Sequence, residues 1–395
     1  LVSKTIYENI DIPVNDLRYI PVTTSIAFED YINNFKKTTK YTYSGTGMGV
    51  EISSKPKGTL LSEEVIQGEY IKMTEYSDFD REHKGIVEFL PKTKTVTYSK
   101  NSEKIVYRTN YEYDSKYRII KQTDYANLPE QVVTQYEYYP HGNLRKTTVS
   151  VPGLPTQTDT YEYDKRFRLP TRTTNSLGQT TERVYDFCTG NILRYRDIDG
   201  SVTKYKYNAQ GRLCKKSLPT GQTVEYESRY TNPEGADYFV SESYSPEPLS
   251  KTTVVYNKFD EEIERSETGP NGKILFGEKS YDYRHRLYKE VGLHTKNEQS
   301  PPYTEYYYDY LDRIKSKTVF DGLFTNRTEY AYSDRTTTIT DAEDGKQISK
   351  TTLNDLGLVE SKTDRGGTIY YTYNAEGKPV SISAGGATTE FKYDG

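Results

Sequence analysis

The chain has 395 residues, and its 53 basic and 57 acidic residues are mixed throughout, for a formal net charge of −4. This balance argues against nucleic-acid binding. The sequence also has no run of 18 apolar residues that would predict a membrane span. Hydrophobic residues make up only 33% of the chain, with 41 tyrosines, 12 phenylalanines and no tryptophan. The composition excludes a thick aliphatic core, so tyrosine has to supply much of the buried area.

The N-terminal segment, residues 1–40, shows helical periodicity. Four apolar residues follow the i, i+3, i+4, i+7 spacing of a helix face: Phe28, Tyr31, Ile32 and Phe35. This spacing predicts one short amphipathic helix over 25–37, and the alternative is a loop with scattered aromatic residues. Residues 41–110 contain Tyr41-Thr-Tyr43 and strand-like stretches at 95–98 and 104–107. We interpret them as degenerate repeats or a transition segment.

From residue 111 to 395 one phrase keeps returning: Tyr-x-Tyr, then Asp or Asn, then Gly-Arg-Leu three residues later. The cleanest copy is Tyr205, Tyr207, Asn208, Gly211, Arg212 and Leu213. Further copies are Tyr111, Tyr113 and Asp114; Tyr161, Tyr163 and Asp164; Tyr185, Asp186 and Gly190; Tyr281 and Asp282; Tyr308 and Asp309; and Tyr373, Asn374 and Gly377. The copies recur every 20–25 residues or so, a period typical of repeat architectures. A wider gap after Asn208 predicts a degenerate copy around Tyr226.

The phrase predicts a β-hairpin. Two tyrosines at i and i+2 lie on one face of a strand, and the residue between them, such as Glu112 or Lys206, belongs on a wet face. Asp or Asn can bond its own backbone and start a turn, and the following Gly supplies the left-handed position. Asp312 and His285 replace that Gly in two copies and tolerate this geometry. Two other copies have Tyr117 and Phe167 there, and we expect a different turn in them.

One repeat is therefore two antiparallel strands and two turns, and the fold class is all-β. At about 11 residues per strand and turn, residues 111–395 hold about 25 strands, and at about 4.8 Å each a flat sheet would measure about 120 Å. Open twisted sheets rarely exceed ~10 strands without curling. The sequence predicts a long curled sheet, as part of a spiral shell or solenoid, which ends in mid-repeat at residues 393–395.

These phrases resemble the YD repeats of the Rhs family, which includes bacterial Rhs and wall-associated repeat proteins, the BC component of Tc toxins and the teneurins. The resemblance covers roughly residues 111–395 and implies a β-sheet strip that spirals into a hollow shell. In bacterial members the shell often encloses a C-terminal toxic domain. It also implies a secreted or cell-surface location. The family's closing Asp-Pro-x-Gly-Leu segment with its self-cleaving aspartates is absent, so that activity is assigned to no residue here.

The search for catalytic or ligand-binding chemistry nominates no residue. The four histidines, at positions 83, 141, 285 and 294, are scattered, and no cluster has metal-ligand spacing. The glycines at 45, 47 and 49 lack the pattern of a phosphate loop. The recurring Asp is best explained as a turn residue, because Asn replaces it in several copies. The spacing of Cys188 and Cys214 leaves open whether they form a disulfide.

The sequence thus predicts a non-catalytic structural scaffold without a cofactor. The first functional hypothesis is a shell that encloses or delivers another polypeptide, such as a cargo domain of the same parent chain. The alternative is a cell-surface adhesion or carbohydrate-binding module, because exposed tyrosine rows stack on sugar faces and repeats give multivalency.

Overall fold

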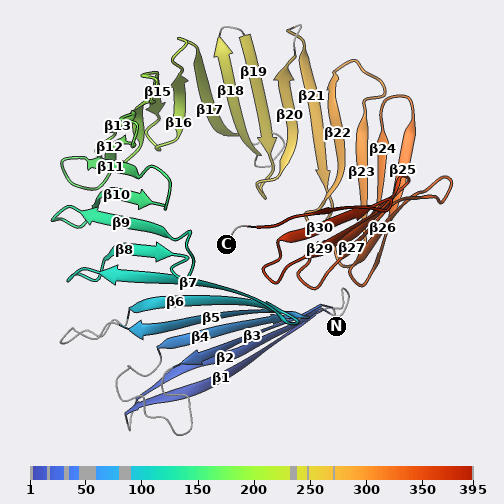
Figure 1. The fold of residues 1–395 in the computed structure, drawn as a ribbon. Helices are drawn as coiled ribbons and strands as arrows, with labels where there is room; N and C mark the ends of the chain where they lie inside the picture. Colours follow the sequence, from blue (N-terminus) through green and yellow to red (C-terminus); the bar gives the residue numbers. More distant parts are fainter. Residues whose placement is uncertain are drawn as a thin grey trace. The chain divides into compact units, whose positions relative to one another are not determined.

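The computed structural model describes residues 3–15, 18–30, 35–43, 59–79, 90–231, 238–246, 249–269 and 272–393. Within these ranges the chain forms 31 strands and no helix (Figure 1). The strands belong to one sheet, and every pairing described between two strands is antiparallel and joins neighbours in the sequence, as between β17 and β18. The fold is therefore all-β and built from successive hairpins, which confirms the predicted fold class.

The first ten strands are β1 (Ser3–Asn15), β2 (Arg18–Asp30), β3 (Phe35–Tyr43), β4 (Leu60–Gln67), β5 (Tyr70–Phe79), β6 (Pro91–Lys100), β7 (Glu103–Tyr113), β8 (Ile119–Asp124), β9 (Val132–Tyr138) and β10 (Leu144–Ser150). The next eight are β11 (Gln157–Tyr163), β12 (Pro170–Thr174), β13 (Thr180–Tyr185), β14 (Ile192–Arg196), β15 (Val202–Tyr207), β16 (Leu213–Ser217), β17 (Thr223–Thr231) and β18 (Tyr238–Pro246).

The remaining strands complete the chain. They are β19 (Leu249–Tyr256), β20 (Glu262–Thr268), β21 (Ile274–Tyr281), β22 (Leu287–Thr295), β23 (Tyr303–Tyr308), β24 (Ile314–Phe320), β25 (Thr325–Ser333), β26 (Thr336–Asp341), β27 (Gln347–Leu353), β28 (Val359–Asp364), β29 (Gly367–Tyr373), β30 (Pro379–Ala384) and β31 (Ala387–Glu390).

The chain divides into two compact units. Unit 1 comprises Leu1–Thr158, Ala331–Ile339 and Gln347–Gly395, and unit 2 comprises Asp159–Tyr330 and Thr340–Lys346. In unit 1, β1 to β10 each pair with the next strand, and so do β27 to β31. In unit 2, β11 to β25 form one uninterrupted succession of paired strands.

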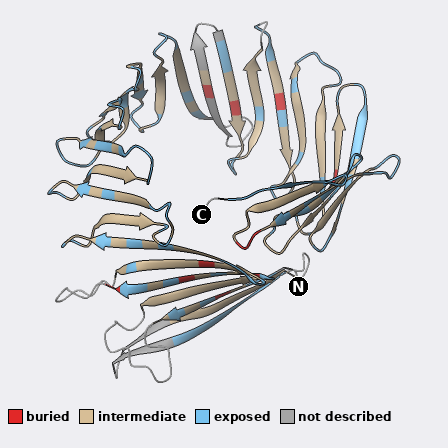
Figure 2. Cartoon of the chain, viewed as in Figure 1, coloured by how far each residue is buried: buried red, intermediate tan, exposed pale blue. Residues whose placement is uncertain are grey.

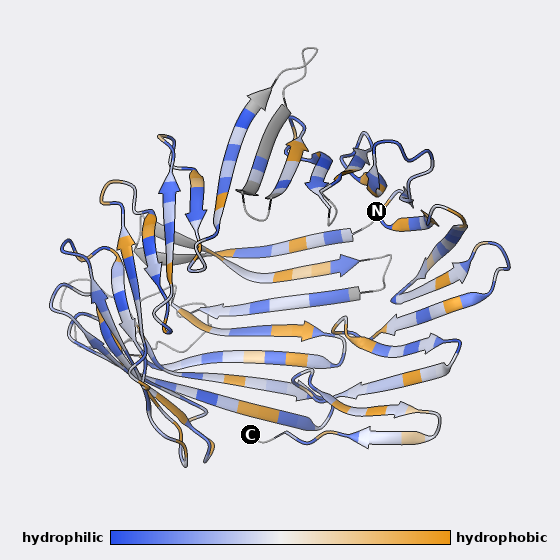
Figure 3. Ribbon diagram, turned by 90° about the horizontal axis from the view of Figure 1, so that it is seen from above, coloured by the Kyte–Doolittle hydropathy of each residue, from blue (hydrophilic) through white to orange (hydrophobic). Residues whose placement is uncertain are grey.

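The sheet is a single layer with few buried side chains. The buried hydrophobic residues among those described are Tyr70, Phe79, Val254 and Ala375, and most strand residues are half-buried (Figure 2). Hydrophilic and hydrophobic residues follow one another along individual strands (Figure 3). In β7, Tyr111 and Tyr113 are half-buried while Glu112 between them is exposed, as the alternation of a strand requires. The stability is therefore a sum of many neighbour contacts, as in repeat proteins generally.

One carboxylate is buried in the sheet of unit 2. Glu242 of β18 is 8% exposed and accepts hydrogen bonds from Arg229 Nη1 of β17 at 2.7 Å and from Thr253 Oγ1 of β19 at 3.1 Å. Lys251 Nζ lies 2.8 Å from Glu242 Oε1, the oxygen that also accepts the Thr253 bond. The Arg229 bond, followed by the Lys251 bond, lowers the pKa of Glu242 to about 2. This cluster joins three successive strands through a charge that is fully paired.

The predicted helix over 25–37 is wrong where the structure describes it. Residues 25–30 belong to β2 and residues 35–37 to β3, and 31–34 lie outside the described residues. Phe28 pairs with Thr5 of β1 and with Lys37 of β3. The run from 22 to 26 is rich in β-branched residues, which favour strands. Two neighbouring strands also satisfy the backbone of β2, and this outweighs a weak helical spacing.

The degenerate copy expected around Tyr226 lies in β17. This strand continues to Thr231, five residues beyond Tyr226, and pairs with β18 along its length. No turn follows Tyr226 directly, and the connection at 232–237 lies outside the described residues. The repeat is longer here than in the neighbouring copies, and its strands β17 and β18 each have nine residues.

Candidate functional site: the repeated hairpin turn

The Asp or Asn that follows the second Tyr of the phrase is here called the marker residue, and so is Asn354, which follows Leu353 in a weaker copy. The marker residue organises the hairpin turn. Asn208 Oδ1 accepts hydrogen bonds from the backbone N–H of Gln210 at 3.1 Å and of Arg212 at 2.9 Å. The Asn208 carbonyl accepts the Gly211 N–H at 3.0 Å. The same side-chain bonds to residues i+2 and i+4 occur at Asp114, Asp282, Asp309, Asn354 and Asn374. The marker thus satisfies the turn's backbone donors.

An arginine four residues after the marker adds an ion pair in several Asp copies. Arg286 donates through Nε at 2.8 Å and through Nη2 at 2.6 Å to Asp282 Oδ2. The hydrogen bonds from the Arg286 side chain are the largest influence on Asp282 and hold the pKa of that carboxyl below its usual value. Comparable pairs join Arg118 to Asp114 and Arg313 to Asp309. An Asn marker makes the turn without this pair, so the charge is an addition to the turn and not its cause.

The third residue after the marker adopts the left-handed backbone. Gly211 has a φ of 78°, and His285 and Asp312 reach 63° and 64° in the same position. The strand register shifts between Lys206 and Tyr207. This combination matches the hairpin loop in which a left-handed residue forms a bulge. The turn therefore accepts residues other than Gly at its left-handed position.

The expectation that Tyr117 and Phe167 give a different turn is wrong for Tyr117 and confirmed for Phe167. The turn with Phe167 is one residue longer, because Asp164 N–H donates to the Leu169 carbonyl, whereas Asp114 N–H donates to the Arg118 carbonyl and Asn208 N–H to the Arg212 carbonyl. Both aromatic residues nevertheless adopt the left-handed backbone. Their φ values are 63° and 59°. Tyr117 N–H donates to the Asp114 carbonyl at 3.0 Å, and Phe167 N–H donates to the Asp164 carbonyl at 2.8 Å, as Gly211 does to Asn208. The marker's side-chain bonds impose the turn and hold an aromatic residue in a conformation that costs about 1–3 kcal/mol.

The copy at Asp186 contains one additional residue. Gly190 N–H donates to the Asp186 carbonyl at 2.9 Å, and Asp186 N–H donates to the Asn191 carbonyl at 2.7 Å. Gly190 supplies the left-handed residue with a φ of 78°. Cys188 lies in this turn and is exposed, and Cys214 in β16 is half-buried. Both cysteines are free thiols.

In several copies the second Tyr of the phrase connects its hairpin to the previous one. Its hydroxyl donates to a backbone carbonyl at or just before the second strand of the preceding hairpin, an arrangement here called the tyrosine latch. The donors and acceptors are Tyr113 to Pro91, Tyr138 to Ile119, Tyr185 to Pro170, Tyr207 to Ile192, Tyr281 to Glu262, Tyr308 to Leu287, Tyr373 to Val359 and Tyr393 to Pro379. The distances range from 2.6 Å for Tyr308 to 3.0 Å for Tyr207.

Partial burial raises the pKa of six latch tyrosines, which therefore stay neutral donors: Tyr138, Tyr185, Tyr207, Tyr281, Tyr308 and Tyr373. Sequence reasoning placed these rings on a half-buried face but assigned no partner to the hydroxyl. A signal was present in the chain itself, because the copies quoted above have Tyr and never Phe in this position. The weaker copy at Asn354 has Leu353 in this position and forms the same turn, so the hydroxyl adds a contact between hairpins that the turn itself does not require.

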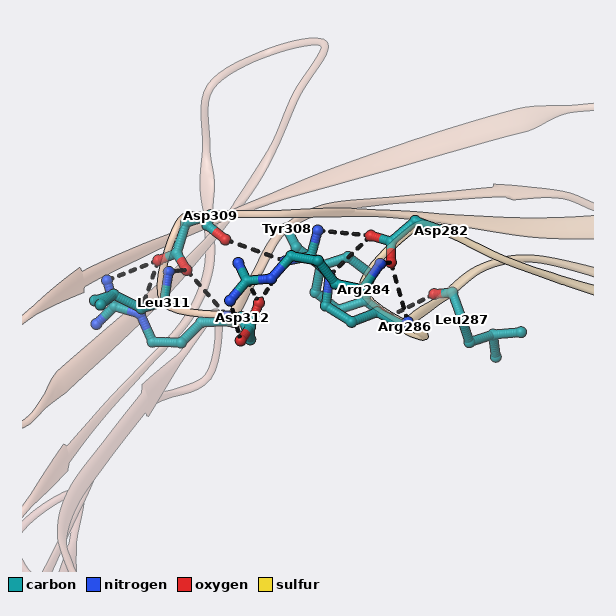
Figure 4. A network of polar contacts seen from close by, with 9 residues as sticks. Asp282, Arg284, Arg286, Leu287, Tyr308, Asp309, Leu311 and Asp312 are labelled. Atoms are coloured by element: carbon teal, nitrogen blue, oxygen red, sulfur yellow. Dashed lines mark hydrogen bonds and ion pairs between the residues drawn. The ribbon is translucent and has the colours of Figure 1, made fainter. Parts of the chain in front are cut away.

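Neighbouring turns are also connected by charge. Asp312, in the turn after β23, accepts hydrogen bonds from Arg286 Nη1 at 2.6 Å and from Arg284 Nη2 at 2.9 Å, and both arginines belong to the turn after β21 (Figure 4). Arg286 therefore contacts its own marker Asp282 and a residue of the next turn. This edge of unit 2 is bound together by side chains in addition to the strand hydrogen bonds.

The other residues considered for chemistry have local contacts. His141 stacks on Tyr139 with ring centroids 5.1 Å apart, His285 Nδ1 lies 3.0 Å from Glu261 Oε1, and His294 Nδ1 lies 2.9 Å from the Gly292 carbonyl. His83 and the glycines at 45–49 lie outside the described residues. In the part of the chain that the structure describes, no three His, Cys, Asp or Glu side chains gather as a metal site. Over the same residues, no helix is long and apolar enough to cross a membrane.

One family model matches part of the repeat region. The family model of the RHS Repeat matches residues 189–223, which contain the cleanest copy of the phrase. No curated protein matches the sequence significantly. Among solved structures, the crystal structure of TcdB2-TccC3 aligns with 96% of this chain and 23% of its own length, at 9% identity and a TM-score of 0.48.

A second solved structure is the Photorhabdus luminescens Tc holotoxin pore with a mutated TccC3, which aligns with 96% of this chain and 22% of its own length, at 10% identity and a TM-score of 0.45. The chain thus spans less than a quarter of either matched chain. Several copies of the phrase share the marker turn and the tyrosine latch. Residues 189–223 thus match the RHS Repeat family, and the same phrase recurs on both sides of this match.

Proposed function

We propose that the sheet of this Rhs-type structural scaffold forms the wall of a shell that encloses or delivers another polypeptide. We also propose that the protein acts outside the bacterial cell or at its surface. The observation that best supports this proposal is the uninterrupted succession of fifteen paired strands, β11 to β25, in unit 2 alone. Sheets of this size rarely stay open and flat, because each strand is rotated by about 20–25° relative to its neighbour. A curled single layer has a concave face that can surround a guest.

The contacts between repeats suit a wall. Successive hairpins are attached to one another by strand hydrogen bonds and, in several copies, by a tyrosine latch such as the one from Tyr207 to Ile192. Stability that is summed over neighbours does not require a thick core. The interior of such a wall stays available for another chain, and its polar rows, such as Glu112, Glu137 and Glu162, keep one face wet.

The test is electron microscopy of the complete product of the gene, combined with limited proteolysis. A hollow particle with density inside, and a guest segment that becomes protease-sensitive only after the sheet is unfolded, would support enclosure. A solid rod without a lumen, or a guest segment cleaved at the same rate in the folded protein, would contradict it. The scaffold role does not depend on this result.

The second candidate is carbohydrate binding, favoured by two exposed tyrosines. Tyr283 and Tyr310 are 89% and 78% exposed and lie in adjacent marker turns of unit 2. Arg284 and Asp312 hydrogen-bond to one another between these turns. Aromatic faces beside charged hydrogen-bonding groups are suited to sugars. A glycan array with the intact protein and with the Tyr283→Ala and Tyr310→Ala variants tests this. Binding that both variants lose supports the role, and an array without hits excludes it.

A further inference from the structure

Two marker turns of unit 1 are occupied by hairpin tips from far away in the sequence. In the turn at Asn374, the Ala375 N–H donates to Glu103 Oε2 at 2.9 Å, across 272 residues. In the turn at Asn354, the Asp355 carbonyl accepts a hydrogen bond from Gln67 Nε2 at 2.6 Å, across 288 residues. Both contacts use a backbone group of the residue directly after the marker.

That backbone position is available because of the way the turn is built. The marker's side chain binds the N–H groups of residues i+2 and i+4, and its carbonyl binds the N–H of residue i+3. The residue at i+1 keeps its own N–H and carbonyl for an external partner. A carboxylate fits the N–H, and a side-chain amide fits the carbonyl. Glu103 and Gln67 are these two kinds of partner.

Further contacts surround the two backbone bonds. Lys100 Nζ donates to the Tyr373 carbonyl at 3.1 Å, lies 3.2 Å from Glu69 Oε1 and sits over the Tyr70 ring at 4.7 Å. Tyr107 Oη donates to Glu376 Oε2 at 3.0 Å. Tyr70 is only 4% exposed. In a sheet with few buried residues, this contact contains one of the best-shielded aromatic rings.

The tip of the β4–β5 hairpin is shaped to the turn that it meets. Gly68 has a φ of 58°, and a Cβ built on it would overlap the side chain of Asp355. Arg335 forms an ion pair with Asp355, which holds this side chain in place. Any other residue at 68 would have to push Asp355 away. The glycine therefore serves the approach as well as the turn.

The two hairpin tips and the two marker turns have the same spacing along the sheet. The tips come from two successive hairpins, β4–β5 and β6–β7, and the marker turns come from two successive hairpins, β27–β28 and β29–β30. Hairpins in a sheet advance by about 10 Å, twice the strand spacing. Two tips therefore meet two turns in register, and a slip by one hairpin would remove one of the backbone bonds.

We propose that the marker turn is a receptor for hairpin tips of the same repeat strip. The partner is a tip that presents a Glu or Gln side chain, and the receptor is the backbone N–H or carbonyl of the residue after the marker. In unit 1 the receptors at Asn354 and Asn374 bind the tips that carry Gln67 and Glu103. This clasp, meaning these four contact partners and their neighbours, determines which hairpins of the strip meet. This proposal does not depend on the proposed enclosure of another polypeptide.

Hydrogen exchange of the full chain, measured by mass spectrometry, tests the clasp. Glu103→Ala should raise exchange in peptides covering 370–378 by roughly tenfold, because it removes a charge-assisted hydrogen bond, and should leave peptides covering 205–213 unchanged. Glu112→Ala is the matched control, since Glu112 lies on the same strand and pairs with Lys121 outside the clasp. Glu103→Gln retains an acceptor oxygen and should behave almost like the unmodified protein. Unchanged exchange at 370–378 in Glu103→Ala overturns the proposal.

A second pair of variants decides the question if Glu103→Ala does not fold. Gly68→Ala places a methyl group against Asp355, whereas Gly178, with a φ of 74°, has nothing within 4 Å of a Cβ built on it, so Gly178→Ala is the control. Both variants carry the backbone penalty of a left-handed alanine, and only the first disturbs the clasp. Faster exchange at 354–358 in Gly68→Ala alone supports the proposal. Equal behaviour of the two variants at 354–358 overturns it.

Discussion

The tyrosine latch predicts that one hydroxyl group contributes measurably to the cohesion of two hairpins. Tyr308→Phe removes the hydrogen bond that Tyr308 Oη donates to the Leu287 carbonyl at 2.6 Å (Figure 4) and keeps the ring. The net contribution of such a bond is about 1 kcal/mol, and a buried acceptor left unpaired costs about 1–3 kcal/mol. Because Leu287 is only half-buried, water can reach its carbonyl. We therefore expect a loss of about 1 kcal/mol, a factor of about five in the local opening equilibrium.

The assay for this prediction is local, because a long repeat strip does not unfold as a single two-state unit. Hydrogen exchange of peptides covering β22 and β23 should become about fivefold faster in Tyr308→Phe. Tyr306→Phe is the control: Tyr306 lies on the same strand and is also half-buried, and its hydroxyl has no hydrogen bond to the residues that the structure describes.

Equal exchange in the two variants would refute the latch as a stabilising contact. It would mean that the tyrosine rings pack the hairpins together and that their hydroxyl groups are incidental. A larger effect of Tyr306→Phe than of Tyr308→Phe would refute it as well. The same comparison can be repeated at Tyr207 and Tyr205 in the RHS match, where the hydroxyl of Tyr207 alone donates to Ile192.

Three further predictions concern turns and charge. Glu242 has a pKa lowered to about 2, so its ionised form stabilises unit 2 at pH values above the unfolded pKa near 4.3, and this stabilisation is lost as the pH falls toward 2. Because its partners Arg229 and Lys251 are about half exposed, acid titration should lower the free energy of unfolding by only about 1–2 kcal/mol. Glu242→Gln should abolish this pH dependence. Phe167→Asn should stabilise its hairpin by about 0.5–1 kcal/mol in thermal unfolding, because Asn accepts a left-handed backbone more readily, whereas Phe187→Asn should give no gain. Asp309→Asn keeps the turn bonds and should cost under about 1 kcal/mol by hydrogen exchange, while Asp309→Ala should cost about 1–2 kcal/mol.

The strand and turn periodicity of the sequence was sufficient to predict the fold class. The Tyr-x-Tyr motif with a polar residue between the tyrosines, as at Tyr111 and Tyr113, predicts both a strand and its half-buried face. Asn208 together with Gly211 predicts the turn. These signals are local, so a short window of sequence contains them. The helix prediction over 25–37 failed because its spacing was equally local, whereas β2 is determined by its pairing with β1 and β3.

The turns with Tyr117 and Phe167 show a different limit. Residue preference argued against a left-handed aromatic residue, but the marker's bonds, together with the paired strands, determine the backbone. Preference at one position is a small energy, about 1–3 kcal/mol. Several hydrogen bonds from Asp114 or Asp164 act on the same few residues and outweigh it.

The clasp could not be predicted from the sequence, because the receptor consists of backbone atoms. The residue after the marker is Lys165 in one turn, Ala209 in another and Tyr310 in a third, and this variation suggests that the position has no role. In the turn at Asn374 the functional group is the Ala375 N–H, which every non-proline residue possesses. Side-chain variation is therefore compatible with a fixed contact. The specificity lies in the partner, since only a tip with a carboxylate or amide at the correct height can reach the receptor. It follows that candidate receptors in a repeat strip are better identified from the marker's hydrogen-bond pattern than from side-chain identity after it.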